Sequence, residues 1–368
     1  MLQKTRAIQD LNCLTDRFDN PFVDDVFLRA SEGLFTRGAL HCVETDGYRL
    51  PYELLRDAGT LGIPVARFLS HGSSPIGGAF WNPEGRHERQ ETAFHTALDQ
   101  LADAARADVL LWPYFPLQAR ELGWIDSWLS KRLGLTSGRS QIVMARQHSR
   151  AFLNCSSGAV GEEEGGLHVS RNKRKTTQRQ WRRLADLGEV TFESTRDGLG
   201  RDDAIEAFFR VEASGWKASA GTALAVEPGL NAFAQTVFPQ MIASEQAQID
   251  LMMLNGHCIS GLVSFRSGRG LFTWKTGMDD VYRRYSPGVQ ILLEASQQAI
   301  SDPDIDYIDS LADSGHMVAE HIWAGRRSLA LLFIPLSTFG MVASHGLRGA
   351  YVARDSARYW AKRALGRV

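Results

Sequence analysis

The sequence predicts a mixed α/β fold, and three local patterns carry that prediction. Short apolar runs alternate with amphipathic helical stretches along most of the chain. The dipeptide Asn255-Gly256 separates two such runs and favours a two-residue β-hairpin turn. A further run at 270–278 leads through a Pro-Gly turn into a strongly amphipathic stretch that we expect to be helical from 289 to 300. A hairpin followed by a strand, turn and helix is typical of a mixed sheet covered by helices.

Apolar spacing and turn residues place the elements of the first half. Phe94, Leu98 and Leu101 recur at helical spacing, and the apolar run after them indicates a buried strand. A Gly-, Pro- and Ser-rich loop at 72–78 breaks regular structure by its composition. The expected elements are a helix ending at 35, strands at 38–43, 48–54 and 63–70, a helix at 91–105 and a strand at 109–112.

The second half is expected to begin after an acidic segment that lacks periodicity. This segment, 158–166, contains three consecutive glutamates and is interpreted as an exposed linker. Ser170 is a suitable helix N-cap, and Gly188 ends the pattern. The expected elements are helices at 170–186, 201–214, 229–243, 289–300 and 317–323, and strands at 189–193, 247–254, 257–266, 270–278, 305–311 and 329–334. The predicted domains are an N-terminal half at 1–157, a linker at 158–169, a C-terminal half at 170–340 and a basic tail at 341–368.

Composition bounds the class of protein. Of the 368 residues, 44% are hydrophobic and 23% are charged, with a formal net charge of −1. This balance indicates a globular protein and argues against one whose entire surface binds nucleic acid. The four cysteines lie far apart and form no CxxC pair, so we expect a reduced protein without a metal site.

Neither a secretory signal nor a membrane span is expected. The first residues lead into a mixed polar segment instead of an apolar core. The longest apolar stretch, 328–343, is interrupted by Pro335 and is shorter than the roughly 20 residues that a bilayer requires. We therefore expect a cytoplasmic location.

The turn before residue 289 has the features of an anion-binding site. Pro287 cannot continue the preceding strand, and Gly288 lets a ligand approach the backbone closely. The helix that follows would direct unpaired N–H groups and the positive end of its dipole toward that turn. The residues expected to hold a diphosphate are Ser286, Gly288, Val289 and Gln290 through their main chain, with help from Arg283 or Arg284. The alternative for the two arginines is an exposed position without a ligand.

Four segments together resemble a known family. They are the basic helix 171–183, the sequence EASGWK at 212–217 followed by AGTAL, the sequence YRRYSPG at 282–288, and the late stretch DSLADSGHM at 309–317. In this order they resemble the acetyltransferase-like family associated with cellulose and exopolysaccharide synthesis (BcsL/CelD-like). That family is a branch of the GCN5-related N-acetyltransferases (GNAT) and is related to the Fem peptidyltransferases. The resemblance implies two tandem GNAT-like halves in a mixed α/β fold.

The resemblance also implies an activity. It points to an N-acyltransferase that uses acetyl-CoA or a longer acyl-CoA as donor and modifies an amine of a cell-envelope precursor, foremost an amino sugar of an exopolysaccharide or holdfast. One alternative acceptor remains open, a sphingoid-base-like lipid amine. One alternative donor also remains open, aminoacyl-tRNA. A different class also remains open, namely a catalytically silent protein that binds a nucleotide or partner, because the Tyr-Lys pattern of many family members is replaced here by a segment ending in His316-Met317.

Acyl transfer to an amine requires a proton acceptor. The candidates are Glu212, His316, Asp309 and Asp313. Burial of Glu212 near an aromatic ring would raise its pKa toward the working pH, whereas an imidazole titrates near neutrality with little tuning. The alternative for Glu212 is a structural pairing with Lys217 or the nearby turn.

Acceptor contacts are expected from aromatic and cationic side chains. Trp216 could stack on the acceptor and Lys217 could bind its phosphate or carboxylate, while the alternative is packing of Trp216 in the core. Arg174 and Tyr285 are further candidates for acceptor binding.

Two basic segments suggest anionic partners. The helix 171–183 carries seven positive charges and no acidic residue, which fits a sugar nucleotide, a lipid headgroup, the 3′-phosphate of the donor, or tRNA. The tail 341–368 combines arginines with Tyr359 and Trp360, a composition that suits peripheral contact with an anionic membrane. Docking of the tail on its own domain is the alternative.

Overall fold

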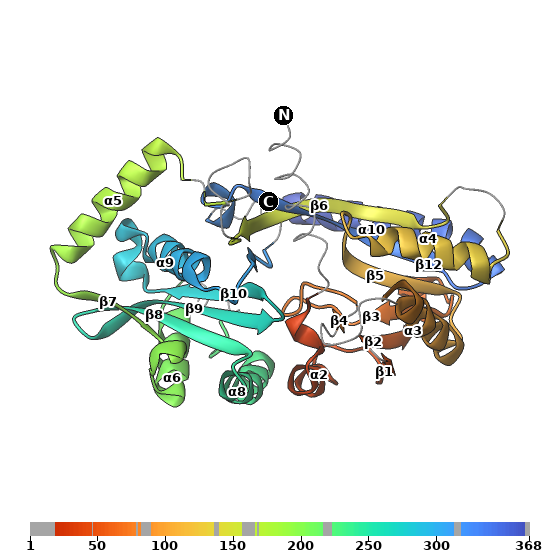
Figure 1. Cartoon of the computed structure of the whole chain (residues 1–368), viewed down its shortest axis with the longest axis horizontal. Helices are drawn as coiled ribbons and strands as arrows, with labels where there is room; N and C mark the ends of the chain where they lie inside the picture. The colour runs from red at the N-terminus through yellow and green to blue at the C-terminus, as the bar shows by residue number, and fades with distance from the viewer. Residues whose placement is uncertain are drawn as a thin grey trace. The chain divides into compact units, whose positions relative to one another are not determined.

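The computed structural model describes residues 19–45, 47–78, 80–81, 90–135, 140–156, 166–167, 169–215, 223–312 and 318–364. Within these, the chain divides into two compact units (Figure 1). Of the described residues, unit 1 contains those within 24–34 and 149–327, and unit 2 contains those within 19–23, 35–148 and 328–364. Each unit is built from more than one stretch of the chain. The sequence-based division into consecutive halves did not include this exchange of segments.

The sheet of unit 1 is mixed. Its strands follow the order β11-β10-β9-β8-β7, and the residues 152–154 of β6 pair with β11. All neighbours are antiparallel except β10 and β11, which run parallel. The strands are β6 (Val143–Asn154), β7 (Val190–Ser194), β8 (Ala247–Leu254), β9 (His257–Ser267), β10 (Gly270–Met278) and β11 (Tyr307–Asp309).

Helices cover both faces of this sheet. In Figure 1, α6 and α8 lie on one face and α9 lies on the other. The apolar residues of α9 at 289, 292, 295 and 299 are buried at helical spacing against the sheet. The helical elements of unit 1 are α2 (Asp25–Ser31), α5 (Arg171–Ala185), η5 (Thr195–Asp197), α6 (Arg201–Ala213), α8 (Pro228–Ala243), η6 (Asp280–Tyr285), α9 (Pro287–Ser301) and η7 (Ala319–His321).

Local sequence explains two connections in unit 1. Asn255 and Gly256 have φ values of 50° and 76°, which a two-residue hairpin turn requires, and they join β8 to β9 in the predicted register. Pro287 occupies the first position of α9, where its fixed φ suits a helix. Proline costs no hydrogen bond there, because an N–H at this position has no acceptor within the helix. The hairpin is confirmed, and α9 begins two residues before the predicted start at 289.

The strands of unit 2 follow the order β1-β2-β3-β5-β12 and are also mixed in direction. The pair β3 and β5 is parallel, and the other described pairs are antiparallel. Trp112, Phe94 and Phe68 lie at the centre of its core. Its elements are η1 (Pro21–Val23), β1 (Leu40–Thr45), β2 (Tyr48–Leu55), η2 (Ala58–Thr60), β3 (Val65–Phe68), β4 (Phe80–Trp81), α3 (Gln90–Ala105), β5 (Val109–Pro116), α4 (Glu121–Arg132), β12 (Gly325–Pro335) and α10 (Thr338–Ala364).

The mixed α/β fold class is confirmed, and some elements differ from expectation. β6 was not predicted, because Arg146, Gln147 and His148 interrupt its apolar pattern. Helix α4 was also missed. The helix expected at 317–323 is a single 3-10 turn, Ala319–His321, in the part of it that the structure describes. None of the described helices is long and apolar enough to cross a bilayer.

Candidate active site

The most distinctive feature of unit 1 is an opening between its two parallel strands. β10 and β11 pair only from Gly270 to Phe272 and from Tyr307 to Asp309. β10 then continues to Met278, so its last six residues have no strand beside them on that edge in the described structure. On its other edge, the register with β9 shifts at Trp274, which makes a β-bulge. The second part of β10 therefore extends beyond the end of its pairing with β11.

Helix α9 begins beside this opening. A β-carbon added to Gly288 would lie 3.7 Å from Cγ2 of Thr276 and 3.8 Å from Sδ of Met278, both on β10. The first turn of α9 thus borders the end of β10 that lies beyond the pairing with β11. Because the N-terminus of a helix carries partial positive charge, an anionic group in the opening would be stabilised there.

The predicted cradle of four main-chain amides is wrong for three of them. Ser286 N–H donates to the carbonyl of Arg283 at 3.0 Å. The N–H groups of Val289 and Gln290 donate to the carbonyl of Ser286 at 2.9 and 3.2 Å. The reason is the left-handed conformation of Ser286, with φ 53° and ψ 51°, which turns its carbonyl under the first turn of the helix. Only the N–H of Gly288 remains from the predicted set.

The side chains of the same turn are also engaged. Gln180 of α5 donates to the carbonyl of Arg284 at 3.1 Å and to Oγ of Ser286 at 2.9 Å. Arg283 and Arg284 are exposed, and the Arg284 guanidinium lies 4.8 Å from the centre of the Tyr285 ring. Tyr285 is buried and lines a small cavity of about 280 Å³ with Arg284, Arg183 of α5, and Asp186, which follows α5. The two arginines are therefore the exposed cationic part of the turn.

Glu212 closes α6 and is almost fully buried, with 1% of its surface exposed. Its Oε2 accepts a hydrogen bond from the N–H of Leu224 at 2.8 Å. Gly277 of β10 lies so close that an added β-carbon would be 2.8 Å from the Glu212 α-carbon. The carboxylate therefore binds the main chain at Leu224, and Glu212 itself lies next to the second part of β10.

Asp309 is the centre of a buried ionic cluster. Its Oδ1 lies 2.6 Å from Nε of Arg150, and its Oδ2 accepts hydrogen bonds from Arg150 and Arg327, each at 2.8 Å. Burial raises the pKa of Asp309, but attraction to the two guanidiniums outweighs it, and the pKa lies below its ordinary value. A carboxylate that is so strongly held in its charged form is a poor proton acceptor.

Several predicted residues lie outside the described part of the chain. These are the proton-acceptor candidates Asp313 and His316 and the acceptor-binding candidates Trp216 and Lys217. Arg174 is described and lines a groove between α5 and α9. Of the predicted carboxylate proton acceptors, only Glu212 and Asp309 are described, and both carboxylates contact other residues.

Asp280 is a residue that sequence reasoning missed. It follows the end of β10, and both its carboxylate oxygens lie 3.9 Å from where a β-carbon on Gly215 would be. Oδ1 of Asp280 is buried and has no hydrogen-bond partner in the described structure. Its neighbour Asp279 instead caps the following turn by accepting the N–H of Val281 at 2.9 Å. Two consecutive aspartates directly after a strand were the signal that could have identified it.

A family model matches this unit. Residues 171–317 match the model described as an acetyltransferase (GNAT) domain. This part of the chain has a GNAT-type acyltransferase fold. The GNAT domain so defined begins at α5 and contains β7 to β11, the opening between β10 and β11, and the start of α9.

Solved structures resemble the fold along most of the chain. One is a conserved protein of unknown function from Bacteroides thetaiotaomicron, with 11% identity, a TM-score of 0.54, and coverage of 87% of this chain and 92% of that one. FemX has 8% identity, a TM-score of 0.52, and coverage of 89% and 95%. The C-terminal domain of a putative lysylphosphatidylglycerol synthetase from Agrobacterium fabrum has 11% identity, a TM-score of 0.50, and coverage of 95% and 96%. At these identities the likeness concerns the fold alone. No curated protein sequence matches the chain.

Proposed function

We propose that the protein is an acyl-CoA-dependent N-acyltransferase whose donor lies in the opening between β10 and β11. The observation that carries this proposal is the early end of the β10–β11 pairing beside the first turn of α9. The match of residues 171–317 to an acetyltransferase domain supports an acyl donor. The N–H of Gly288, the helix dipole and the side chains of Arg283 and Arg284 would neutralise the phosphates of the donor.

The reaction needs few groups from the protein. The amine nitrogen attacks the thioester carbonyl, the C–N bond forms, the C–S bond breaks, and the thiolate leaves and takes up a proton. Alternate residues of a strand direct their N–H groups to the same edge, and we assign stabilisation of the oxygen that becomes negative to the edge of β10 beyond its pairing with β11. We assign the uptake of the amine proton to Asp280, because its buried Oδ1 has no other partner in the described structure.

The acceptor in this proposal is an amine of a cell-envelope precursor, foremost an amino sugar. Support comes from the resemblance of the motifs at 171–183, 212–217 and 282–288 to the exopolysaccharide-associated acetyltransferase family. We further propose that α10 contacts an anionic membrane, where such precursors are assembled. Its described surface exposes Val342, Trp360 and Phe339 at 74%, 61% and 58%.

Calorimetry with acetyl-CoA and a long-chain acyl-CoA tests the donor site. A Gly288→Leu variant places a side chain in front of the helix terminus, where the nearest protein atoms stay at ordinary contact distance. We expect it to fold and to bind the donor at least 10-fold more weakly. Gly123→Leu is a matched control, because Gly123 also lies in a helix and has open space around it. Equal donor binding by wild type and Gly288→Leu would refute the proposed site.

One observation favours a second candidate. Three of the four amides that would grip a diphosphate are already bonded inside the protein. A donor without a diphosphate, such as aminoacyl-tRNA, fits this arrangement, and the seven cations of α5 could contact its backbone. Transfer of a labelled amino acid from charged tRNA, with no binding of either acyl-CoA, would select this candidate over the first.

A further inference from the structure

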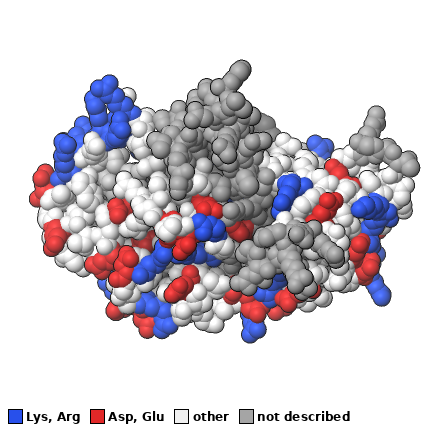
Figure 2. Space-filling view, viewed as in Figure 1, with Lys and Arg blue, Asp and Glu red and all other residues white. Residues whose placement is uncertain are grey.

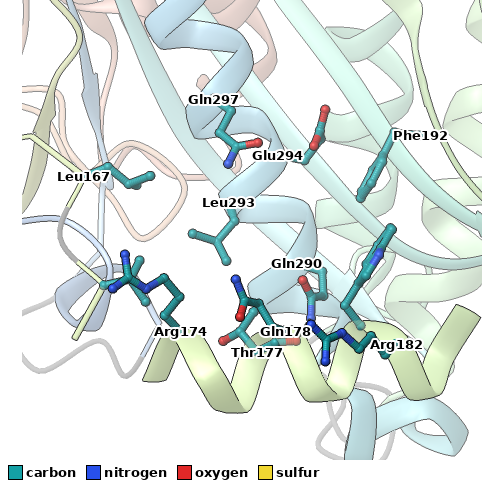
Figure 3. Close-up of a pocket in the computed structure, with 12 residues that line it drawn as sticks. Leu167, Arg174, Thr177, Gln178, Arg182, Phe192, Gln290, Leu293, Glu294 and Gln297 are labelled. Atoms are coloured by element: carbon teal, nitrogen blue, oxygen red, sulfur yellow. Dashed lines mark hydrogen bonds between the residues drawn. The ribbon is translucent and has the colours of Figure 1, made fainter. Parts of the chain in front are cut away.

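A groove runs between α5 and α9 in the GNAT domain. It has a volume of about 640 Å³, within the range of small-molecule pockets. Figure 3 shows Thr177 and Gln178 of α5 facing Gln290 and Leu293 of α9, with Arg174 and Arg182 at opposite ends. A hydrogen bond from Nε2 of Gln290 to the carbonyl of Thr177, at 3.1 Å, joins the two helices.

The inner wall of this α5–α9 groove is apolar and aromatic. Trp181 and Phe192 stack in parallel, with ring centres 5.8 Å apart and an angle of 4° between the planes. Both rings are half-buried, and Leu293 and Val169 also line the groove. A flat ring could slide between the indole face and the aliphatic side chains.

One polar atom inside the groove lacks a partner. Thr177 is 6% exposed, and its Oγ1 makes no hydrogen bond in the described structure. A buried hydroxyl without a partner is costly, because it has lost its hydrogen bonds to water. Since Thr177 lines the groove, a ligand with a polar edge would satisfy it.

The rim on the α5 side is cationic and uncompensated. Arg174, Gln178 and Arg182 follow each other at intervals of four residues, which places them on one ridge of the helix. None of the seven cations between 171 and 183 forms an ion pair with any residue that the structure describes. Figure 2 shows their blue side chains gathered where Figure 1 places α5. An anion is therefore the missing partner of this rim.

We propose that the α5–α9 groove binds a nucleoside phosphate. The base would lie against Trp181, the hydroxyl of Thr177 would bond to its polar edge, and Arg182 would bind the phosphate. On the opposite rim, Glu294 would accept hydrogen bonds from the ribose hydroxyls. The chemistry needed is a flat polar ring, a sugar and a phosphate, and the groove supplies one contact for each.

The proposed function suggests two sources of such a ligand. Only this choice of sources rests on the proposed function. An adenosine phosphate would be the nucleotide part of the acyl donor. A uridine phosphate would be the carrier of a sugar acceptor. Calorimetry with AMP, UMP, ribose 5-phosphate and inorganic phosphate distinguishes the two sources. Tighter binding of AMP would indicate the acyl donor, and tighter binding of UMP would indicate the sugar carrier.

Variants of the groove test the assignment of each contact. Trp181→Ala and Arg182→Gln should each weaken binding of the preferred nucleotide about 10-fold or more. Thr177→Val keeps the shape and removes the unpaired hydroxyl, so it should weaken binding severalfold while leaving the melting temperature equal or higher. Arg179→Gln removes the same charge as Arg182→Gln from a part of α5 outside the groove and should not change binding of the nucleotide.

Two outcomes would overturn the inference. One is the absence of saturable binding of both nucleotides. The other is equal weakening by Arg179→Gln and Arg182→Gln with no effect of Trp181→Ala, which would indicate general attraction to a basic helix. These binding measurements need no turnover. An absence of nucleotide binding would therefore not refute the acyltransferase proposal, and an absence of acyl transfer would not affect the interpretation of the binding data.

Discussion

Oδ1 of Asp309 lies 2.6 Å from Nε of Arg150, and both side chains are almost entirely buried. Arg327, which also belongs to unit 1, contacts the same carboxylate, so Asp309 binds two buried guanidiniums at the point where β10 and β11 separate. This cluster fixes the edge of the opening without offering a proton acceptor to it.

Removal of this carboxylate should strongly destabilise unit 1. Asp309→Asn keeps the shape but removes the negative charge that the two buried guanidiniums contact, and breaking a buried pair in this way costs about 3–5 kcal/mol. Chemical denaturation would measure the loss. Asp202→Asn is the control, because its pair with Arg201 is fully exposed and should contribute nothing measurable. A loss for Asp309→Asn below about 1 kcal/mol would contradict a structural role for the cluster.

The same carboxylate predicts a pH dependence. Because the pKa of Asp309 is lower in the folded protein than in the unfolded chain, the unfolded state binds the proton more readily. Its contribution to stability is therefore complete well above the ordinary aspartate pKa of 3.8 and is lost as the pH falls through the folded pKa. Denaturation curves from pH 6 to pH 2 should show the difference between wild type and Asp309→Asn shrinking at the acid end. A constant difference would contradict the lowered pKa.

His71 predicts a second pH effect, in unit 2. Its ring stacks on Phe35 with centres 3.9 Å apart, and Nδ1 accepts the N–H of Ser73. Burial, with repulsion from Arg67, lowers the pKa of His71 to about 3. The unfolded chain takes up this proton near pH 6.5, so stability should fall steadily as the pH drops from about 6.5 toward 3. His71→Gln should flatten this part of the curve, and an unchanged slope would show that another group is responsible.

Two carboxylate-to-amide variants separate the roles of Asp280 and Glu212. Asp280→Asn should lower kcat about 100-fold or more, because loss of a proton acceptor has effects of that size. Glu212→Gln should retain kcat within severalfold, since the amide oxygen can still accept the N–H of Leu224. Steady-state kinetics with the acyl donor would measure both. The reverse ranking would assign the proton acceptor to Glu212.

The exposed apolar side chains of α10 predict binding to anionic vesicles. Arg363 stacks over Trp360 at 5.4 Å, and the one acidic residue of the helix, Asp355, is paired with Arg146. A Val342→Glu/Trp360→Glu variant should lose co-sedimentation with vesicles that contain phosphatidylglycerol, because charge would enter the contact face. Leu54→Ser, which changes an exposed apolar residue on β2, is the control. Dimerisation of the wild type without vesicle binding would indicate a second copy as the partner of α10.

Local sequence was sufficient for some parts of the site and insufficient for others. Asn255-Gly256 and Pro287 act through the conformations of single residues, so the hairpin and the start of α9 could be predicted. The engagement of the amides at 289 and 290 depends on the left-handed conformation of Ser286, which its residue type does not specify. The α5–α9 groove joins residues more than a hundred positions apart, so no local pattern could reveal it.

Hydrogen–deuterium exchange with and without acetyl-CoA tests the central claim most directly. The donor should slow exchange in peptides that cover the part of β10 beyond its pairing with β11, 273–278, and the start of α9, 286–292. Gly288→Leu should remove that protection, while Gly123→Leu should preserve it. Protection of neither segment at a saturating donor concentration would contradict an acyl-CoA site at this opening.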